Sequence, residues 1–392
     1  MARERGRIER VDVSGNTRTS TEVIVRALRL GQDATYRETL PAALRARLLN
    51  LRLFKSVEVQ GLRVGDGGWA LQVTVAERWT LIPVPFASTS SGQWKAGLFL
   101  VESNLLGLNK VLALGGYVGN RGDCAFLVYR DPALLGTDWT ASGQFVYLDS
   151  VHGRFAGDNP AETFQDRRVD ASANLGRHFS RTLWAALGGF ALWTRPKTLA
   201  PWSSLPLEDQ RVFGLSAEAT WDAQDFHFYF NQGPRLSVKW SEGLTALGSD
   251  RALHRLSAKA TYGTVIGPGH ALTVTGRFDL SRGDPWVDAL LLGGEPGTRG
   301  FQAGGLWGEE AATATVDYQI PLWRPSFGTL TEGAFLDGGV VNWRGEKTPV
   351  LSPGLGTRLY LQGLALPALG VDMAFNTQSK EVLFSLAVGV SL

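Results

Sequence analysis

The residue types that usually carry out catalysis are few and widely separated in this sequence. Cys124 is the only cysteine, so neither a disulfide nor a thiolate metal cluster is expected. Asp222 and Asp225 lie three apart on a predicted strand and therefore point to opposite faces. Nucleophile elbows, phosphate-binding loops and His-Glu-x-x-His are absent from the sequence. The five histidines lack zinc-binding spacing: His152, His178, His227, His254 and His270. We predict no enzyme activity, no metal and no cofactor.

The most informative stretch is a glycine-rich loop at residues 292–301 that carries one arginine, Arg299. Apolar and polar residues alternate before it, over 272–281, and after it, over 312–320. Such alternation gives each strand one apolar face and one polar face. Because the polar face carries Arg and Asp and the pattern recurs, it predicts a membrane barrel with a wet lumen. The loop could then fold into that lumen.

The composition agrees with a barrel. The net charge is +2 and 19% of residues are charged, so no nucleic-acid partner is expected. The chain has 47 glycines, which suit turns, and 13 tryptophans, which suit membrane–water boundaries. No apolar run is long enough for a transmembrane helix, which leaves a closed barrel as the way to span a bilayer. The first seven residues lack the apolar segment of a signal peptide, so we expect the sequence given to start after a cleavage site.

Residues 1–78 are predicted to form a separate α+β domain. A strand starts at Ile8, and Thr19-x-x-Glu22 is a capping-box pattern for a first helix. A second helix over about 38–53 carries its apolar stripe on Leu40, Leu44, Leu48 and Leu51. Strands at 54–59 and 69–75 follow, which gives the order β-α-α-β-β.

Residues 79–392 are predicted to form a 16-stranded antiparallel transmembrane β-barrel. An even number of strands is usual for bacterial barrels. The predicted long connections are 150–167, 195–209, 243–253 and 283–309. The predicted strands are 80–88, 93–103, 109–120, 122–131, 138–149, 168–179, 181–194, 210–222, 227–242, 254–266, 270–282, 310–321, 328–341, 351–362, 366–377 and 381–392.

Several motifs, in order, give the chain its resemblance to a known family. The first domain resembles a POTRA domain through residues 8–16, 53–59 and 73–77. The barrel resembles the BamA/TamA-type superfamily of outer-membrane assembly and transport proteins, also called bacterial surface antigen barrels. The motifs that carry this second resemblance are Asn104–Gly107, Tyr129–Gly136, Trp221–Asp225, Gln232–Arg235, Gly293–Phe301 and Phe335–Gly339. The loop departs from the family at Thr298, where a larger aliphatic residue is usual.

The resemblance implies a location in the bacterial outer membrane, with residues 1–78 in the periplasm. It also implies that Arg299 pairs with Asp337 inside the barrel, with Gly300 allowing close approach and Phe301 packing on the wall. This pair could brace the loop without doing chemistry. Further cations are expected to line the lumen: Arg177, Arg235, Lys239, Arg277 and Arg358.

Three functions remain open on the sequence. In the first, the chain inserts unfolded outer-membrane proteins by templating their strands at a seam between the first and last barrel strands. Pro83 and Pro85 lack backbone donors there, and the last strand contributes Phe384, Leu386, Val388 and Val390. In the second, secreted polypeptide crosses the lumen, as in two-partner secretion. In the third, the barrel is structural and closed.

Partners follow from the same resemblance. Family members bind extended client segments at a POTRA sheet edge, which here includes Val57 and Val59. A spacer that binds no client is the alternative. Outer-membrane lipid and accessory periplasmic proteins or lipoproteins complete the expected partners.

Overall fold

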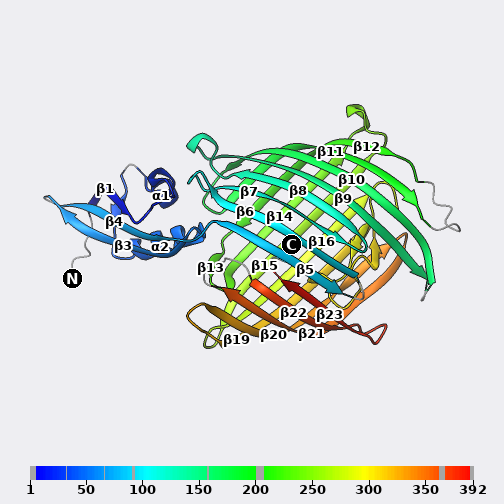
Figure 1. Cartoon of the computed structure of the whole chain (residues 1–392). Helices are drawn as coiled ribbons and strands as arrows, with labels where there is room; N and C mark the ends of the chain where they lie inside the picture. Colours follow the sequence, from blue (N-terminus) through cyan, green and yellow to red (C-terminus); the bar gives the residue numbers. More distant parts are fainter. Residues whose placement is uncertain are drawn as a thin grey trace.

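A computed structural model describes residues 6–31, 33–65, 67–90, 93–156, 159–199, 207–361 and 367–388. A small N-terminal domain lies beside one end of a large barrel (Figure 1). We call this the near end of the barrel and the opposite one the far end. None of the helices described is long and apolar enough to cross a membrane.

The N-terminal domain is a four-stranded sheet covered by two helices, in the sheet order β2-β1-β4-β3. β1 and β4 are parallel, whereas β3 and β4 are antiparallel. The short β2 and the long β3 are therefore its edges. The elements are β1 (Gly6–Ser14), α1 (Thr21–Leu28), β2 (Thr35–Tyr36), α2 (Leu40–Asn50), β3 (Phe54–Val64) and β4 (Gly68–Glu77).

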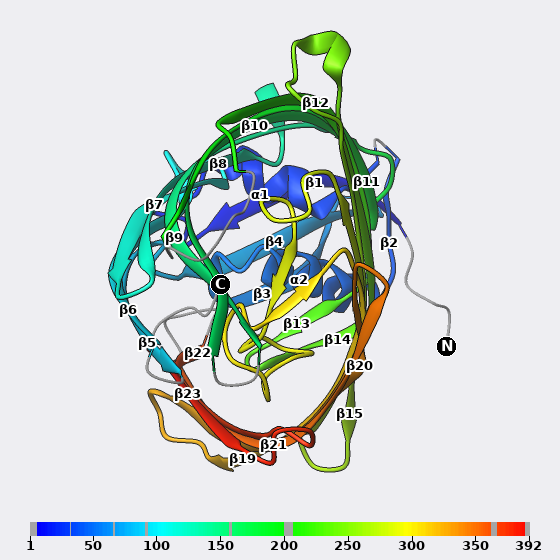
Figure 2. The same ribbon diagram turned by 90° about the vertical axis from the view of Figure 1, so that its right-hand side faces the viewer.

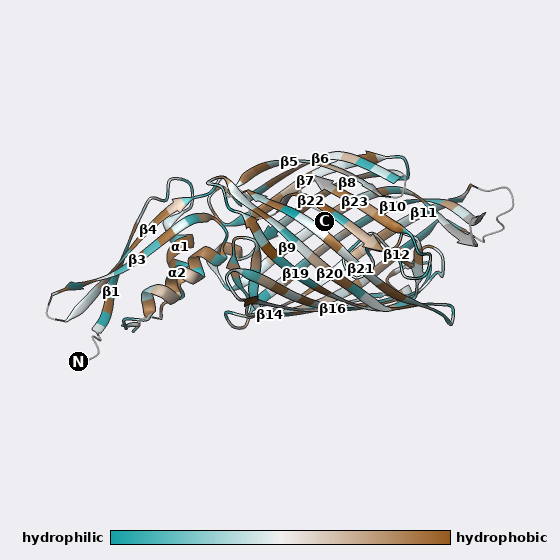
Figure 3. Ribbon diagram, turned by 90° about the horizontal axis from the view of Figure 1, so that it is seen from below, coloured by the Kyte–Doolittle hydropathy of each residue, from teal (hydrophilic) through white to brown (hydrophobic). Residues whose placement is uncertain are grey.

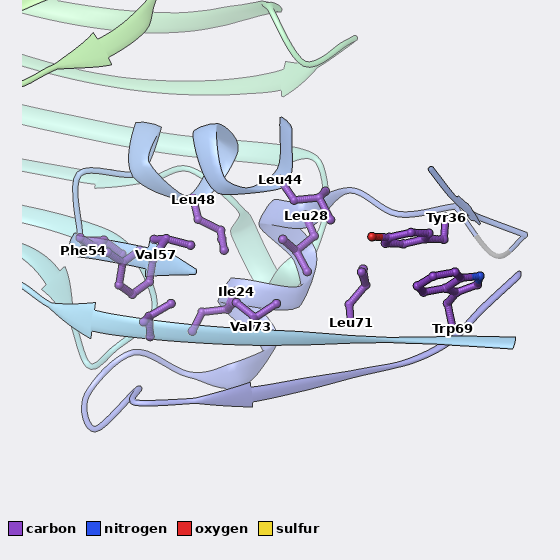
Figure 4. Packing of buried hydrophobic residues seen from close by; sticks show 12 residues of the cluster. Ile24, Leu28, Tyr36, Leu44, Leu48, Phe54, Val57, Trp69, Leu71 and Val73 are labelled. Atoms are coloured by element: carbon purple, nitrogen blue, oxygen red, sulfur yellow. The ribbon is translucent and has the colours of Figure 1, made fainter. Parts of the chain in front are cut away.

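The core of this domain lies between the helices and the sheet (Figure 4). Leu44 and Leu48 of α2 are fully buried, as their helical spacing predicts. The rings of Tyr36 and Trp69 stack with centroids 3.8 Å apart. The predicted cap of α1 is off by one residue: Ser20 is the N-cap, and its Oγ accepts a hydrogen bond from Glu22 N (3.2 Å). The Thr19 hydroxyl instead accepts a hydrogen bond from Asn104 of β6, outside the domain.

Sixteen main strands form an antiparallel barrel, and the short β13 (Asp225–His227) adds a ribbon to β14. Two 3₁₀ turns, at Leu134–Gly136 and Thr245–Leu247, lie in connections. The strands are β5 (Leu81–Ser90), β6 (Gln93–Leu105), β7 (Lys110–Gly119), β8 (Gly122–Asp131), β9 (Trp139–Ala156), β10 (Asn159–His178), β11 (Leu183–Thr198), β12 (Gln210–Asp222), β14 (Phe230–Gly243), β15 (Leu253–Ile266), β16 (His270–Arg282), β19 (Glu310–Trp323), β20 (Gly328–Trp343), β21 (Glu346–Leu361), β22 (Pro367–Phe375) and β23 (Val382–Val388).

Hydrophobic and hydrophilic residues alternate along the barrel strands (Figure 3). On β20, Leu336 and Val340 are exposed on the outside, whereas Thr331 and Asp337 are fully buried on the inside. On β23, Val382, Phe384 and Leu386 are exposed on the outside. This pattern confirms a barrel with an apolar exterior and a polar lumen.

One predicted connection is wrong. Residues 150–167 belong largely to β9 and β10, which remain paired far beyond the rest of the wall. Their polar composition suggested a loop, but the polar side chains bond across the ladder. Gln165 and Arg167 both donate to Asp149, at 2.6 and 2.9 Å. A strand that extends past the bilayer needs no apolar face, so the alternation signal disappears there.

Candidate functional site

The connection at 283–309 folds back into the barrel rather than extending away from it (Figure 2). Within it, β17 (Leu290–Leu292) and β18 (Leu306–Gly308) form a hairpin. The segment between these strands presents Arg299 to the inner faces of β19 and β20. Thr298 N donates to Glu295 O (2.8 Å), and Phe301 N donates to Thr298 O (3.0 Å). The Thr298 side chain is also buried.

Arg299 is held by two carboxylates on adjacent strands. Its Nη2 and Nε donate to Oδ1 and Oδ2 of Asp337, at 2.7 and 2.9 Å, and its backbone N donates to the same Oδ2 at 3.0 Å. Nη1 donates to Asp317 Oδ1 at 3.1 Å. Thr315 Oγ1 donates to Asp337 Oδ1 at 2.9 Å. The Arg299 guanidinium carbon lies 3.4 Å from the centroid of the Phe335 ring.

The structure therefore brings Arg299 and Asp337 together, and it adds partners that the sequence reading missed. Asp317 lies two positions after Thr315 on β19, so both face the lumen. This spacing in the sequence could have indicated that Asp317 lies near the loop. The pair is almost inaccessible, since Arg299 is 6% exposed and Asp337 is 0% exposed. Buried charges need partners and further hydrogen bonds of this kind, so the arrangement braces the loop.

Gly300 and Phe301 contact the wall next to this pair. A Cβ on Gly300 would lie 2.0 Å from Ser352 Oγ, so a larger residue would push the loop away from β21. Phe301 packs in a cluster with Leu292 and Val350. Within the residues described, no group of His, Cys, Asp and Glu could hold a metal ion.

A second anchor, which the sequence reading did not find, holds the first part of the connection. The carboxylate of Asp288 is buried and accepts hydrogen bonds from Nη2 of Arg251 (2.9 Å) and from Nη2 of Arg255 (3.2 Å). Ser281 Oγ donates to Asp288 O at 2.6 Å. An aromatic cluster of Phe164, Trp286, Trp307 and Trp343 packs beside it. These tryptophans are buried inside the barrel and do not form part of a membrane boundary.

The predicted lumen cations divide between the two faces. Arg358 lies inside, and its Nη2 donates to both Oδ1 and Oδ2 of Asp372, each at 2.7 Å. Arg235 lines a polar lumen cavity of about 420 Å³, together with Lys259, which was not predicted. Lys239 shares the face of β14 that carries Arg235 but does not line this cavity. Arg277 pairs with Glu295 of the loop (3.3 Å). Arg177 contradicts the prediction, because it shares the outward face of β10 with Leu175, which is 50% exposed.

The seam between β5 and β23 is the least paired junction of the described wall. The ladder consists of Thr89 with Leu386, Ser88 with Ala387, and Ala87 with Val388. The neighbouring β5–β6 ladder is unbroken from Leu81 to Ser90. Phe384 and Leu386 face outward. Val390 and the three residues around it, 389–392, lie outside the described residues.

At Pro83 and Pro85, the backbone position that would carry an N–H lies on the side of β5 that faces the seam. Ser103 N donates to Thr80 O at 3.0 Å, so even-numbered residues of β5 hydrogen-bond toward β6. Bonding direction alternates along an antiparallel strand, so odd-numbered residues turn their backbone groups toward β23. Both prolines are odd-numbered and lack an N–H. They therefore remove two possible bonds from the seam and none from the β5–β6 ladder.

The N-terminal domain contacts the near end of the barrel at two places. Asn104 Nδ2 donates to Thr19 Oγ1 (2.9 Å), and Ser20 N donates to Gly107 O (2.9 Å). Asn50 Nδ2 donates to Asp225 Oδ1 (2.9 Å) and its Oδ1 accepts from Phe226 N (2.9 Å).

The ring of Phe226 is also the centre of a cationic contact. Arg52 and Arg78 lie over this ring at 4.6 and 5.7 Å. Arg52 Nη2 donates to Asn231 Oδ1 at 3.2 Å as well. The turn after β6 and the turn after β12 thus contact the start of α1, the end of α2 and the residue that follows β4.

The predicted client edge is partly occupied. β3 is an edge of the sheet, and the Val57 side chain is buried in the core while Val59 packs against it. Arg45 Nε of α2 donates to Val57 O at 3.0 Å, so this carbonyl points away from β4 and is already bonded. The outward groups of Val59 and Gly61 have no such partner within the described part of the chain.

Comparison with known proteins identifies the class. The model of the Omp85 superfamily domain matches residues 104–370. The chain therefore belongs to the Omp85 superfamily, whose BamA-type members are outer-membrane β-barrels that act in protein assembly or transport and are not enzymes.

Individual relatives differ in extent. The outer membrane protein assembly factor BamA of Neorickettsia risticii (strain Illinois) is 29% identical over 146 residues, which are 36% of this chain and 19% of that protein. The aligned part thus spans about a fifth of this curated relative.

Two solved structures show the same fold. BamA from Haemophilus ducreyi lacking POTRA domains 1–3 has 15% identity and a TM-score of 0.60, covering 98% of this chain and 84% of that one. CdiB from Escherichia coli has 14% identity and a TM-score of 0.66, covering 98% and 76%. Identities this low establish the architecture alone, so the choice between assembly and translocation depends on the site.

Proposed function

We propose that this chain assembles outer-membrane proteins by templating a client β-strand at the β5–β23 seam. The observation that carries the proposal is the short ladder there, limited in the described residues to three pairs. Pro83 and Pro85, further along β5, supply no backbone donor on the side of the strand that faces the seam. An edge with unpaired backbone groups accepts an incoming strand, because each new pair satisfies donors and acceptors of both chains. Residues 1–78 then lie in the periplasm and meet the client first.

The free edge of β3 supports the same proposal. A client segment that pairs from Val59 onward would extend the sheet by one strand. Arg45 limits this pairing at Val57, since a client would have to displace its bond to the carbonyl. Unfolded outer-membrane proteins are the proposed clients, with accessory lipoproteins as further partners. The alternative for this domain is a spacer between the barrel and such partners.

A reversible lock across the seam tests the proposal. With Cys124→Ser as background, cysteines replace Thr89 and Leu386, which face each other in the ladder. Facing residues lie within the Cα separation of a disulfide. The protein is reconstituted in liposomes, and folding of an unrelated outer-membrane barrel is followed. We expect accelerated client folding, loss of the acceleration on oxidation and recovery on reduction.

A matched lock controls for the chemistry. Tyr262→Cys with Val274→Cys crosses the complete β15–β16 ladder and should leave client folding unchanged. Acceleration that persists in the locked seam would exclude templating there. Vesicles that conduct ions or pass unfolded polypeptide without accelerating client folding would support the translocation pore. If neither activity occurs, the closed structural barrel is the remaining function.

The lumen itself favours assembly over translocation. The connection at 283–309 fills part of it and is fixed by Arg299 and by Asp288. A polypeptide that crossed the lumen would have to displace both buried anchors. Seam opening separates β5 from β23 and does not require either anchor to move, because β20 and β19 lie three and four strands away from β23 in the barrel order.

A further inference from the structure

The outer wall across β10, β11, β12 and β14 has a hollow bounded by large apolar side chains. Register places Arg177, Ala185, Ala219 and Val238 side by side on one rung. On the next rung, Leu175, Leu187, Ala217 and Trp240 lie side by side. The alanines form the floor of the hollow, which measures about 890 Å³ and is also lined by Trp139 and Phe179.

This face is the exterior of the barrel. Leu187 is 71% exposed, and Leu175, Val238 and Trp240 are exposed as well. The β10–β11–β12–β14 ladders are continuous, so no backbone edge is available for another strand. In an outer-membrane barrel, the surface at this height faces lipid.

Arg177 marks one end of the hollow with an unneutralised charge. It lies one residue before the end of β10 at the near end, with its guanidinium carbon 5.7 Å from the centroid of the Trp139 ring. No carboxylate pairs with it among the described residues. Lys110, at the same end of the barrel, is neutralised by Asp131 at 3.1 Å. A charge left open beside an apolar hollow, at the depth of an interfacial Trp, suits an anionic head group.

The surroundings add positive charge. Arg181 is exposed in the turn after β10, and Arg29 is exposed at the end of α1. Burial and then the charges of Arg181 and Arg29 lower the pKa of Arg47 on α2, which shows that these groups lie within electrostatic reach of each other. The N-terminal domain and the turn after β10 thus bring Arg29, Arg47 and Arg181 near one another at the near end, with Asp138 as an acidic residue close to His178.

We propose that this hollow binds one anionic phospholipid from the leaflet on the side of the N-terminal domain. An acyl chain lies over Ala185, Ala217 and Ala219, and the phosphate accepts hydrogen bonds from the Arg177 guanidinium. Arginine suits this role because its planar fork matches phosphate oxygens. The site lies away from the seam and does not depend on the proposed assembly function.

Native mass spectrometry can test the site on the full chain. The protein is reconstituted in vesicles of phosphatidylethanolamine with a minor share of phosphatidylglycerol and then extracted in mild detergent. We expect one retained phosphatidylglycerol, and a loss of retention of about tenfold in Arg177→Gln, as for one charge-assisted contact. Ala219→Leu, which fills the floor, should reduce retention to a similar extent.

Matched variants separate this site from general lipid contact. Arg195→Gln removes an outward cation at the far end that pairs with Asp209 (3.6 Å). Ala312→Leu enlarges an exposed alanine on β19, on another part of the wall. Both should retain lipid as the wild type does. Equal retention in all variants, or no preference for phosphatidylglycerol over phosphatidylethanolamine, would overturn the proposal.

Discussion

All three side-chain nitrogens of Arg299 donate to carboxylates, and most of that bonding goes to Asp337. Asp337→Ala would leave a buried guanidinium with one partner. Breaking a buried pair in this way costs about 3–5 kcal/mol of unfolding free energy. We expect that loss in urea titrations of the folded, heat-modifiable gel band, together with protease cleavage within 283–309.

Asp317→Ala is the matched control for this prediction. Its side chain is 28% exposed and makes a single bond to Arg299, so its removal should cost about 1 kcal/mol. Equal losses in the two variants would mean that the anchor does not centre on Asp337.

Glu77, at the end of β4, holds the loop that precedes α1. Its Oε2 accepts from Thr17 N (3.1 Å) and Arg18 N (2.9 Å), and its Oε1 accepts from Thr19 N (2.6 Å). Burial alone would raise the Glu77 pKa, but hydrogen bonds from Thr19, Thr17 and Arg18 outweigh it and lower the pKa to about 2.

This shift predicts acid sensitivity of the N-terminal domain. A carboxyl whose pKa falls on folding stabilises the folded state above its unfolded pKa, and the gain disappears as pH falls through about 2. The gain is about 1 kcal/mol after solvent screening. Hydrogen-exchange protection of residues 6–31, measured relative to the intrinsic rate at each pH, should fall between pH 4.5 and 2, and Glu77→Gln should remove that pH dependence. A Gln variant with the wild-type profile would contradict this assignment.

At the scale of elements, the turn after β12 connects the two parts of the molecule. Phe226→Ala removes the ring between Arg52 and Arg78, so we expect the N-terminal domain to move more freely against the barrel. Spin labels at Glu58 and Ser180 should then give a broader distance distribution. Phe228→Ala is the control, because this ring packs near Tyr360 inside the barrel. Equal broadening in both variants would contradict the assignment.

The elements also show what sequence can predict. Alternation located all sixteen strands, because each has one face on lipid and one on water, as Val382 and Phe384 illustrate. It failed at 150–167, where polar residues such as Gln165 and Arg167 interrupt the alternation although the strands continue. It also misassigned Arg177, because an outward cation near the membrane boundary breaks the pattern on which the assignment depended. Asp317 and Asp288 were missed since their roles depend on where a distant loop folds.

At the scale of the whole molecule, replacing the two prolines of β5 should change the stability of the seam. Pro83→Ala with Pro85→Ala supplies two backbone donors on the side of β5 that faces the seam, each worth about 0.5–1.5 kcal/mol if bonded. We expect a more stable barrel and slower client folding in the liposome assay. Pro353→Ala on β21, within a complete ladder, is the control and should change neither. Faster client folding in the double variant would contradict seam templating.

The short β5–β23 ladder also has a consequence for the order in which the barrel folds. Its two strands stand at opposite ends of the barrel sequence, so joining them closes the longest loop of the chain for only three backbone pairs within the described residues. Pairings between sequence neighbours, such as β20 with β21, gain more at less entropic cost and should form earlier. Ring closure is then the last step of biogenesis. The junction completed last would also be the first to reopen. The order of folding would therefore determine at which junction the mature barrel opens.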